Sequence, residues 1–236
     1  MILNWYGEAS FRVQTGGIDI AVDPLETGTG LNTSRFKAAV ILDTKGPIPR
    51  PYASQKATEE HYITGPGEYE VKGIEIHGIA APPSPKATDG QSGTIYIVRN
   101  EEITVAFLGY TATTDFSPDT LELLQSADIL CVPVGGDPYL DAAAAANLVK
   151  KVESRIVIPT CYAVPDLNRK ALGVEPFLKL MGQKPEPQEK HSIKAKELIW
   201  EGTKIVVMKT LTHEIIKTKR CKIKKSPFSC FHVLMF

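Results

Sequence analysis

The stretch VILDTKGPIPR, residues 40–50, decides how this chain is interpreted. Its first part is apolar, and Ala39–Leu42 is typical of a short buried β-strand. Its second part is rich in glycine and proline, which interrupt regular structure. The stretch therefore predicts a strand that runs directly into a loop, and Lys45 and Pro47 stand in that loop.

Apolar runs on both sides of this stretch predict a meander of short strands, followed by strands that alternate with helices. Glycines at position 7 and at positions 16 and 17 separate the first three runs. The predicted strands are Ile2–Trp5, Phe11–Gln14, Ile18–Val22, Thr94–Val98, Ile103–Phe107, Ile129–Val134, Arg155–Pro159, Ile193–Lys196 and Lys204–Met208, the last two as edge strands.

The second half of the chain carries helix signals. Ser117 is placed as an N-cap with Pro118 in the first turn. Asp141 begins a second helix that runs to Val152 and ends in lysines, which suit a helix C-terminus. Phe177–Met181 is a third helical stretch. A strand meander followed by βαβ alternation predicts an α/β fold, a four-layer αββα sandwich.

Several ordered segments carry a family resemblance. They are Asn4–Phe11 (NWYGEASF), Ile20–Pro24 (IAVDP), Thr64–Val71 (TGPGEYEV), Gly73–Ile76 (GIEI), Ala106–Gly109 (AFLG), Val132–Gly136 (VPVGG) and Ile156–Tyr162 (IVIPTCY). In this order and spacing the chain resembles the metallo-β-lactamase superfamily, in its lactonase-like, zinc-dependent hydrolase branch. The resemblance covers roughly residues 1–210 and implies the sandwich fold and a metal-dependent hydrolase site.

The metal motif that the resemblance implies, HxHxDH, falls on the loop at residues 45–50. Its first two histidines fall on Lys45 and Pro47, and its aspartate and last histidine fall near Pro49 and Arg50. Charged lysine has no lone pair to offer, and proline has no side-chain ligand. The resemblance therefore predicts the position of a metal site whose main ligands are missing.

At the remaining ligand positions, too, this chain lacks the residues that the resemblance implies. The bridging aspartate falls on Tyr110, the late histidine on Cys161, and the histidine of the opening motif on Glu8. The mid-chain histidine would lie within residues 81–85, which read APPSP. A catalytic zinc needs three protein ligands and an open position, and it lowers the pKa of bound water to about 7. We therefore expect no metal and no other cofactor in this chain.

Five residues are expected to face the former metal cleft because they stand at the ends of the corresponding strands. These weak ligand-binding candidates are Asp23, Lys45, Tyr110, Cys161 and Tyr162.

Lys45 allows three interpretations. Its ammonium could replace the charge of the metal and pair with Asp23 or Asp43, which would otherwise be costly as unpaired buried carboxylates. It could bind a small anionic ligand such as a phosphate or carboxylate. The third interpretation makes it a catalytic base with Tyr110 as the acid.

Composition limits the class of protein. With 236 residues, 43% of them hydrophobic and 23% charged, the chain suits one globular domain. Basic and acidic residues number 27 each, so nothing in the overall charge predicts nucleic-acid binding. No apolar stretch reaches the roughly 18 residues of a membrane span. The first residues lack signal-peptide features, and four scattered cysteines fit a reducing compartment, so we expect a cytoplasmic protein.

The C-terminal segment has a different character from residues 1–210. Residues 211–236 carry a basic cluster, Lys217–Lys225, and then an apolar run, Phe228–Phe236. This extension is open to several interpretations: a disordered tail, a segment that docks on a protein partner, or one that touches a membrane weakly. Self-association into a homo-oligomer also stays open.

These observations predict a metal-free pseudo-hydrolase that serves as a non-catalytic binding or interaction module. The alternative is a lactonase-like metal-dependent hydrolase with an atypical metal site. The first follows from the missing ligands, and the second follows from the family resemblance.

Overall fold

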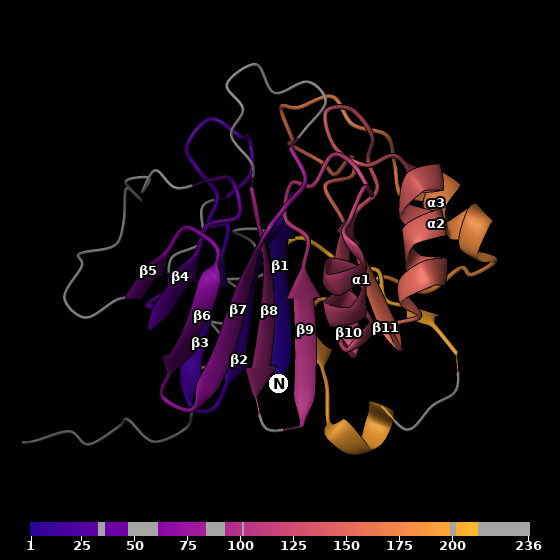
Figure 1. Ribbon diagram of the computed structural model, residues 1–236. Helices are drawn as coiled ribbons and strands as arrows, with labels where there is room; N and C mark the ends of the chain where they lie inside the picture. The colour runs from indigo at the N-terminus through magenta and orange to yellow at the C-terminus, as the bar shows by residue number, and fades with distance from the viewer. Residues whose placement is uncertain (33–35, 47–60, 84–92, 101, 199–201, 212–236) are drawn as a thin grey trace, which may run out of the picture.

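Two β-sheets face each other in this protein (Figure 1). The structure, a computed structural model, describes residues 1–32, 36–46, 61–83, 93–100, 102–198 and 202–211. Pro47, Pro49 and Arg50 of the predicted metal motif, and nearly all of the C-terminal extension, lie outside the described residues. In the described part of the chain, no helix is long and apolar enough to cross a membrane.

The first sheet has the strand order β12-β1-β2-β3-β4-β5. Its strands are β1 (Ile2–Gly7), β2 (Ser10–Thr15), β3 (Ile18–Val22), β4 (Val40–Leu42), β5 (His61–Ile63) and β12 (His191–Ser192). Strands β1, β2 and β3 form an antiparallel meander, whereas β4 and β5 run parallel to β3. The register aligns one buried row across the sheet: Trp5, Phe11, Val22, Leu42 and Ile63.

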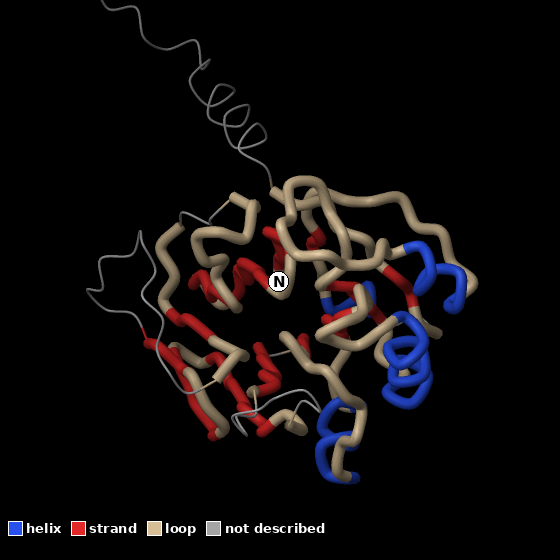
Figure 2. Tube along the Cα trace, turned by 90° about the horizontal axis from the view of Figure 1, so that it is seen from above, coloured by secondary structure: helices blue, strands red, loops and turns tan. Residues whose placement is uncertain are grey.

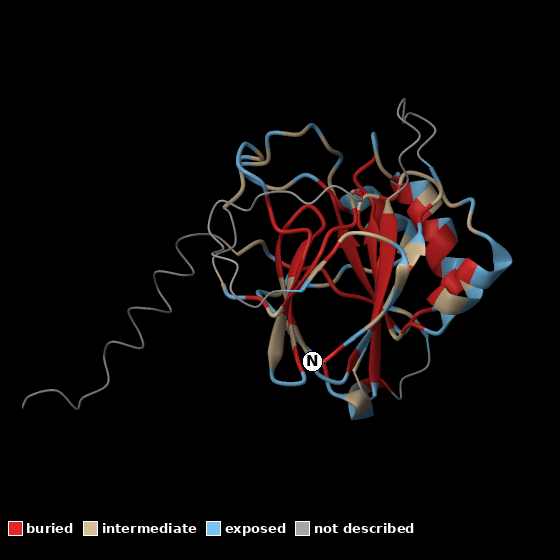
Figure 3. Ribbon diagram, turned by 60° about the vertical axis from the view of Figure 1, so that its left-hand side comes forward, coloured by how far each residue is buried: buried red, intermediate tan, exposed pale blue. Residues whose placement is uncertain are grey.

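The second sheet has the order β13-β11-β10-β9-β8-β7-β6. Its strands are β6 (Gly67–Val71), β7 (Ile74–Ala80), β8 (Thr94–Asn100), β9 (Ile103–Phe107), β10 (Ile129–Pro133), β11 (Ile156–Thr160) and β13 (Lys204–Ile205). Strands β6 to β9 are antiparallel, and β9, β10, β11 and β13 are parallel. Phe11 and Phe107 meet between the two sheets with ring centroids 5.6 Å apart. The core therefore lies between the sheets, where Figure 3 shows the buried strands.

The helices α1 (Pro118–Gln125), α2 (Ala142–Val152) and α3 (Glu175–Met181) lie beside the second sheet (Figures 1 and 2). Both predicted N-caps are confirmed: Ser117 Oγ accepts from the Thr120 N–H, and Asp141 Oδ1 accepts from the Ala144 N–H. Buried residues of α2, including Ala145, Leu148 and Val149, extend the core outward. Two mixed sheets, with these helices beside the second one, confirm the expected α/β sandwich.

The late strands differ from the prediction. The strand in this region comes before the predicted Ile193–Lys196: β12 covers His191–Ser192, and the chain then forms the 3-10 helix Ala195–Leu198. Ile193 still bonds with Met1, donating its N–H to the Met1 carbonyl oxygen at 2.9 Å, and the ladder ends there. Strand β13 is shorter than the predicted Lys204–Met208: beyond Ile205 the Val206 N–H still donates to the Val157 carbonyl oxygen at 2.9 Å, and Met208 then forms an isolated bridge with Gln188. Both strands nevertheless lie at sheet edges, as expected.

Candidate ligand-binding site

The strand ends named by the sequence meet at one end of the sandwich. Asp23 follows β3, Lys45 follows β4 after two residues, Tyr110 follows β9, and Cys161 follows β11. Because β3 and β4 are parallel, and β9 and β11 belong to one parallel set, their carboxyl ends share an edge. Ligands of open α/β sheets commonly bind at such edges.

Two backbone hydrogen bonds join the sheets at this end. The Thr94 N–H donates to the Thr44 carbonyl oxygen at 2.9 Å, and the Cys161 N–H donates to the Glu8 carbonyl oxygen at 3.3 Å. Each bond connects a residue of the second sheet, or of the loop after it, with a loop of the first sheet. The loops around the site are therefore held at fixed positions relative to each other.

Asp23 is a buried carboxyl group that receives two hydrogen bonds from a single residue. The Thr44 N–H donates to its Oδ1 at 2.8 Å and the Thr44 hydroxyl to its Oδ2 at 2.7 Å. Burial nevertheless raises the pKa of Asp23 from 3.8 to about 7, because desolvation outweighs these two hydrogen bonds. Asp43 raises the pKa further and Lys45 lowers it, so the carboxyl is poised to lose its proton near neutral pH.

Lys45 lies partly exposed at the opening of the site. Its ammonium is 3.6 Å from a Glu26 carboxylate oxygen and 4.4 Å from the ring centroid of Tyr110. The expected ion pair with Asp23 or Asp43 is therefore wrong. Asp23 is already satisfied by Thr44, and it is the backbone N–H of Lys45, at 2.9 Å, that binds Asp43.

Two aromatic rings with a cation at each end form a row across the site. Lys45 stands over Tyr110, whose ring centroid lies 5.0 Å from that of Tyr139, and the Arg169 guanidinium lies 5.0 Å from the Tyr139 centroid. A cation over a ring face is attracted by the ring quadrupole, by about 0.5–2 kcal/mol. Burial raises the pKa of both phenols, so both are neutral hydrogen-bond donors.

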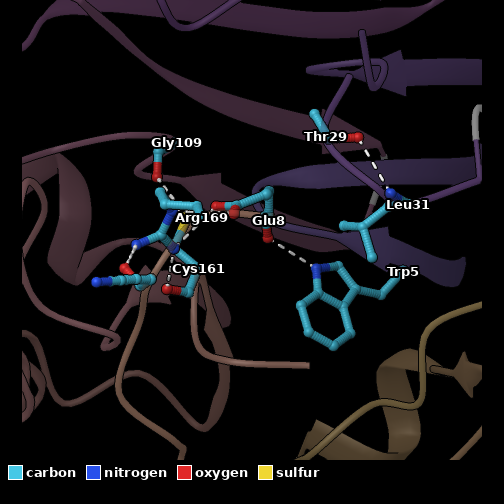
Figure 4. A network of polar contacts seen from close by, with 8 residues as sticks. Trp5, Glu8, Thr29, Leu31, Gly109, Cys161 and Arg169 are labelled. Atoms are coloured by element: carbon cyan, nitrogen blue, oxygen red, sulfur yellow. Dashed lines mark hydrogen bonds and ion pairs between the residues drawn. The ribbon is translucent and has the colours of Figure 1, made fainter. Parts of the chain in front are cut away.

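Behind this row, Arg169 binds Glu8 and Cys161 (Figure 4). Arg169 donates to the two Glu8 carboxylate oxygens at 3.0 and 3.1 Å and to the Cys161 carbonyl oxygen at 2.7 Å. Glu8 is 5% exposed, so this bidentate pair neutralises a buried charge. Burial raises the pKa of the Cys161 thiol, whose sulfur lies 3.9 Å from the Gly109 carbonyl oxygen.

Three of these residues adopt a left-handed backbone conformation although none is glycine. The φ angles are +49° at Glu8, +42° at Asp23 and +55° at Cys161. Such conformations cost of order 1–3 kcal/mol each and cluster at functional sites. The backbone geometry of a site is therefore present at the positions where the resemblance places ligands or their neighbours.

Tyr162 lies apart from the other four candidates. Its ring packs on Trp5, with centroids 5.0 Å apart, and its hydroxyl donates to the Met208 carbonyl oxygen at 3.2 Å. It is buried in the core and does not line the opening of the site.

A cavity of about 200 Å³ opens beside Lys45. Its walls are Thr44, Lys45, Ala81, Pro82, Gly93, Thr94, Leu108, Tyr110, Thr111, Ala112 and Tyr139. Lys45 and Tyr110 are thus the two predicted candidates that reach it, whereas Asp23 and Cys161 lie behind its lining. The sequence reading missed Tyr139 and Arg169, and no local pattern marks either residue.

A larger cavity of about 470 Å³ lies elsewhere, between strands β6 to β8 and the end of α1. Its walls include Glu68, Glu70 and Glu75, and one of its charged groups, Arg99, is 3.7 Å from Glu75. None of the five candidate residues lines it. Its size alone does not make it a site, so the strand-end cavity remains the candidate.

The donors at the strand ends do not fit a zinc ion. Lys45 brings a cation, Glu8 is already bound to Arg169, and the Cys161 thiol is held in its protonated form. Over the described residues, no group of three or more His, Cys, Asp or Glu side chains is placed to hold a metal ion. The chemistry of these residues therefore disagrees with a metal at this position.

Comparison with known proteins gives a consistent result. Residues 2–161 match the family described as the β-lactamase superfamily domain. No curated protein matches the chain. Among solved structures, a protein described as a zinc-dependent hydrolase of the metallo-β-lactamase superfamily from Thermotoga maritima is similar, with 23% identity and a TM-score of 0.66 over 88% of this chain and 97% of that one.

Two further solved structures share the fold at lower identity. Igni18, a metallo hydrolase from Ignicoccus hospitalis, is 18% identical with a TM-score of 0.60, over 89% of this chain and 95% of that one. An isothiocyanate hydrolase from Delia radicum gut bacteria is 10% identical with a TM-score of 0.58, over 83% and 100%. At these identities the likeness concerns the fold.

Proposed function

Because this chain belongs to the β-lactamase superfamily, we propose that it uses the superfamily sandwich as a metal-free, non-catalytic binding module. The candidate site lies at the strand ends, and Glu8, Asp23 and Cys161 have a left-handed backbone there. What differs is the set of side chains that these positions present.

The observation that carries the proposal is the position of the Lys45 ammonium, 4.4 Å from the Tyr110 ring centroid. The resemblance places a histidine ligand at the position of Lys45 and a bridging aspartate at the position of Tyr110. A monovalent and a divalent cation about 4 Å apart repel by about 8 kcal/mol at an effective dielectric constant of about 20. Lys45 therefore opposes a metal ion electrostatically as well as failing to bind it.

The neighbouring acids do not compensate for this loss. The Glu8 carboxylate has both oxygens bound by Arg169, and the Asp23 carboxyl has both oxygens bound by Thr44. A metal would have to displace these partners and expel the proton of Cys161, whose thiol pKa is raised by burial. Without a metal to lower the pKa of water, these residues do not supply a hydroxide nucleophile at neutral pH.

The alternative is a metal-dependent hydrolase with an atypical site. It is favoured by the likeness in fold to the Thermotoga maritima protein, with a TM-score of 0.66. It requires a neutral Lys45 and a rearranged Glu8–Arg169 pair. The donor chemistry argues for the metal-free function.

Elemental analysis of the purified full chain tests the proposal directly. After dialysis against metal-free buffer, zinc, manganese and iron should each be well below one ion per chain. A matched pair of variants sharpens the test: Lys45→Ala removes the cation at the site, and Lys37→Ala removes an exposed one elsewhere. Stoichiometric metal that survives dialysis in the wild-type protein, and a hydrolytic activity lost with a chelator, would refute the proposal.

A further inference from the structure

Three hydrogen-bond donors converge on the strand-end cavity. The Lys45 ammonium and the side chains of Tyr110 and Tyr139 all belong to its walls. Within the described residues, neither phenol hydroxyl has a hydrogen-bond partner, and neither oxygen is among the buried unpaired atoms. Both hydroxyls thus keep a hydrogen-bond donor that no described residue uses, on two rings of the cavity wall that stand beside Lys45.

Lys45 retains donor capacity for a ligand. Its ammonium has three N–H groups, and its ion pair with Glu26, the one formed within the described part of the chain, is at 3.6 Å between two partly exposed side chains. Exposed pairs of this kind contribute about 0–1 kcal/mol. A ligand anion can therefore compete for the ammonium without breaking a strong interaction.

The charge balance of the site favours a monoanion over a dianion. Arg169, the second cation of the row, is committed to Glu8, so among the described residues of the site Lys45 is the cation available to a ligand. The Asp23 carboxyl lies close behind and contributes negative charge when it ionises. A phosphate dianion would need more positive charge than one ammonium provides.

The rest of the cavity wall combines four apolar residues with Gly93 and the threonines Thr44, Thr94 and Thr111. Ala81, Pro82, Leu108 and Ala112 line it, and its volume of about 200 Å³ is well below that of a typical drug-sized pocket of roughly 300–1,000 Å³. Such a wall suits a short hydrocarbon group attached to the anion.

Resting on the function proposed above, we propose that this cavity binds a short-chain or aromatic monocarboxylate. The carboxylate accepts hydrogen bonds from the Lys45 ammonium and from the Tyr110 and Tyr139 hydroxyls, and its hydrocarbon group contacts the apolar wall. Arg169 is a positioning residue, because its guanidinium stands over the ring of the wall residue Tyr139 at 5.0 Å, whereas Arg169 itself is not part of the cavity wall.

Isothermal titration calorimetry of the full-length protein tests this assignment. The probes are acetate, butyrate and benzoate, with butyramide as the uncharged match to butyrate and inorganic phosphate, used at about pH 8.5 where it is a dianion, as the doubly charged match. Butyrate or benzoate should bind, and butyramide and phosphate should bind at least tenfold more weakly. Failure of all three carboxylates to bind, or equal binding of butyramide, would overturn the assignment.

Variants locate the binding. Tyr110→Phe and Tyr139→Phe each remove one donor to a charged acceptor and should weaken binding about tenfold. Lys45→Met should abolish it, whereas Lys37→Met, at an exposed position, should leave it unchanged. The phenylalanine variants keep the ring and its packing, so they remain informative if Lys45→Met does not fold. Unchanged binding in all three cavity variants would overturn the assignment.

Titration in the presence of a chelator separates this inference from the proposed function. Carboxylate binding that disappears with EDTA reports a metal ion and refutes both the metal-free function and the assigned contacts. Binding that resists EDTA but is insensitive to Lys45→Met refutes only the assigned contacts. Binding that resists EDTA and depends on Lys45 and both tyrosines supports the inference.

Discussion

Replacing Asp23 with asparagine should remove a large part of the pH dependence of stability. Burial raises the pKa of Asp23 from 3.8 in the unfolded chain to about 7 in the folded protein. The folded state therefore holds this proton more tightly than the unfolded state. The resulting stabilisation is fully present below pH 3.8 and is lost as the pH rises toward 7.

The magnitude follows from the two pKa values. A rise from 3.8 to about 7 corresponds to about 4 kcal/mol over the whole range. Between pH 5 and pH 8 the wild-type protein should lose about 2.5 kcal/mol from this group. That is a substantial part of the roughly 5–15 kcal/mol by which domains are stable.

Urea denaturation of the wild-type protein and Asp23→Asn at pH 5 and pH 8 measures the effect. Other groups titrate in the same range, so the quantity of interest is the difference between the two proteins at each pH. Asparagine can still accept the Thr44 N–H bond at 2.8 Å, which preserves the loop. Between pH 5 and pH 8, the free energy of unfolding of the wild-type protein should fall relative to that of Asp23→Asn.

A second variant tests the cause of the shift. The Thr44 hydroxyl donates to Asp23 and lowers its pKa, so Thr44→Val should raise that pKa further and move the loss of stability to higher pH. A stability difference between wild-type and Asp23→Asn that is the same at pH 5 and pH 8 would refute the reasoning, as would a shift to lower pH in Thr44→Val.

Three other variants probe the scaffold of the site. Arg169→Met should destabilise the protein by about 3–5 kcal/mol in urea, because Glu8 stays buried without its partner, and adding Glu8→Gln should restore much of the loss; no recovery in the double variant would count against the pair. Gly135→Ala should lower the melting temperature sharply, because its new methyl group collides with a backbone carbonyl oxygen, whereas Gly65→Ala, which faces open space, should be tolerated. Tyr162→Phe should cost about 1 kcal/mol in the same urea assay, because the ring stays packed while one buried hydrogen bond is lost; impaired carboxylate binding in this variant would contradict its place in the core.

Local patterns predicted much of the fold. The caps at Ser117 and Asp141 could be identified because serine and aspartate are strongly preferred at the N-cap, directly before a segment with helical spacing of apolar residues. Strand β6 was not predicted. It lies at a sheet edge with Glu68 and Glu70 exposed, so its composition resembles a polar loop.

The candidate site was predictable only where chain order decides it. Lys45 and Tyr110 follow strands whose ends meet, so their encounter follows from topology. Arg169 reaches Glu8 across 161 residues of sequence, and no spacing encodes that contact. Tyr162 lies in the core beside Trp5 and not at the cavity wall, because the chain has left β11 and takes a left-handed φ of +55° at Cys161, a change of direction that strand alternation does not predict.

The hydrogen bonds from Thr94 to Thr44 and from Cys161 to Glu8 have a consequence for how a ligand would enter. Ligand-binding loops usually belong to the least stable parts of a fold. Here, in contrast, the two hydrogen bonds connect the sheets at the end where the ligand would bind. A ligand would bind to a site whose loops are already ordered, so little conformational entropy of the protein would be lost on association. Slow hydrogen exchange of the Thr94 and Cys161 amides, with and without ligand, is the signature expected of such a rigid receptor.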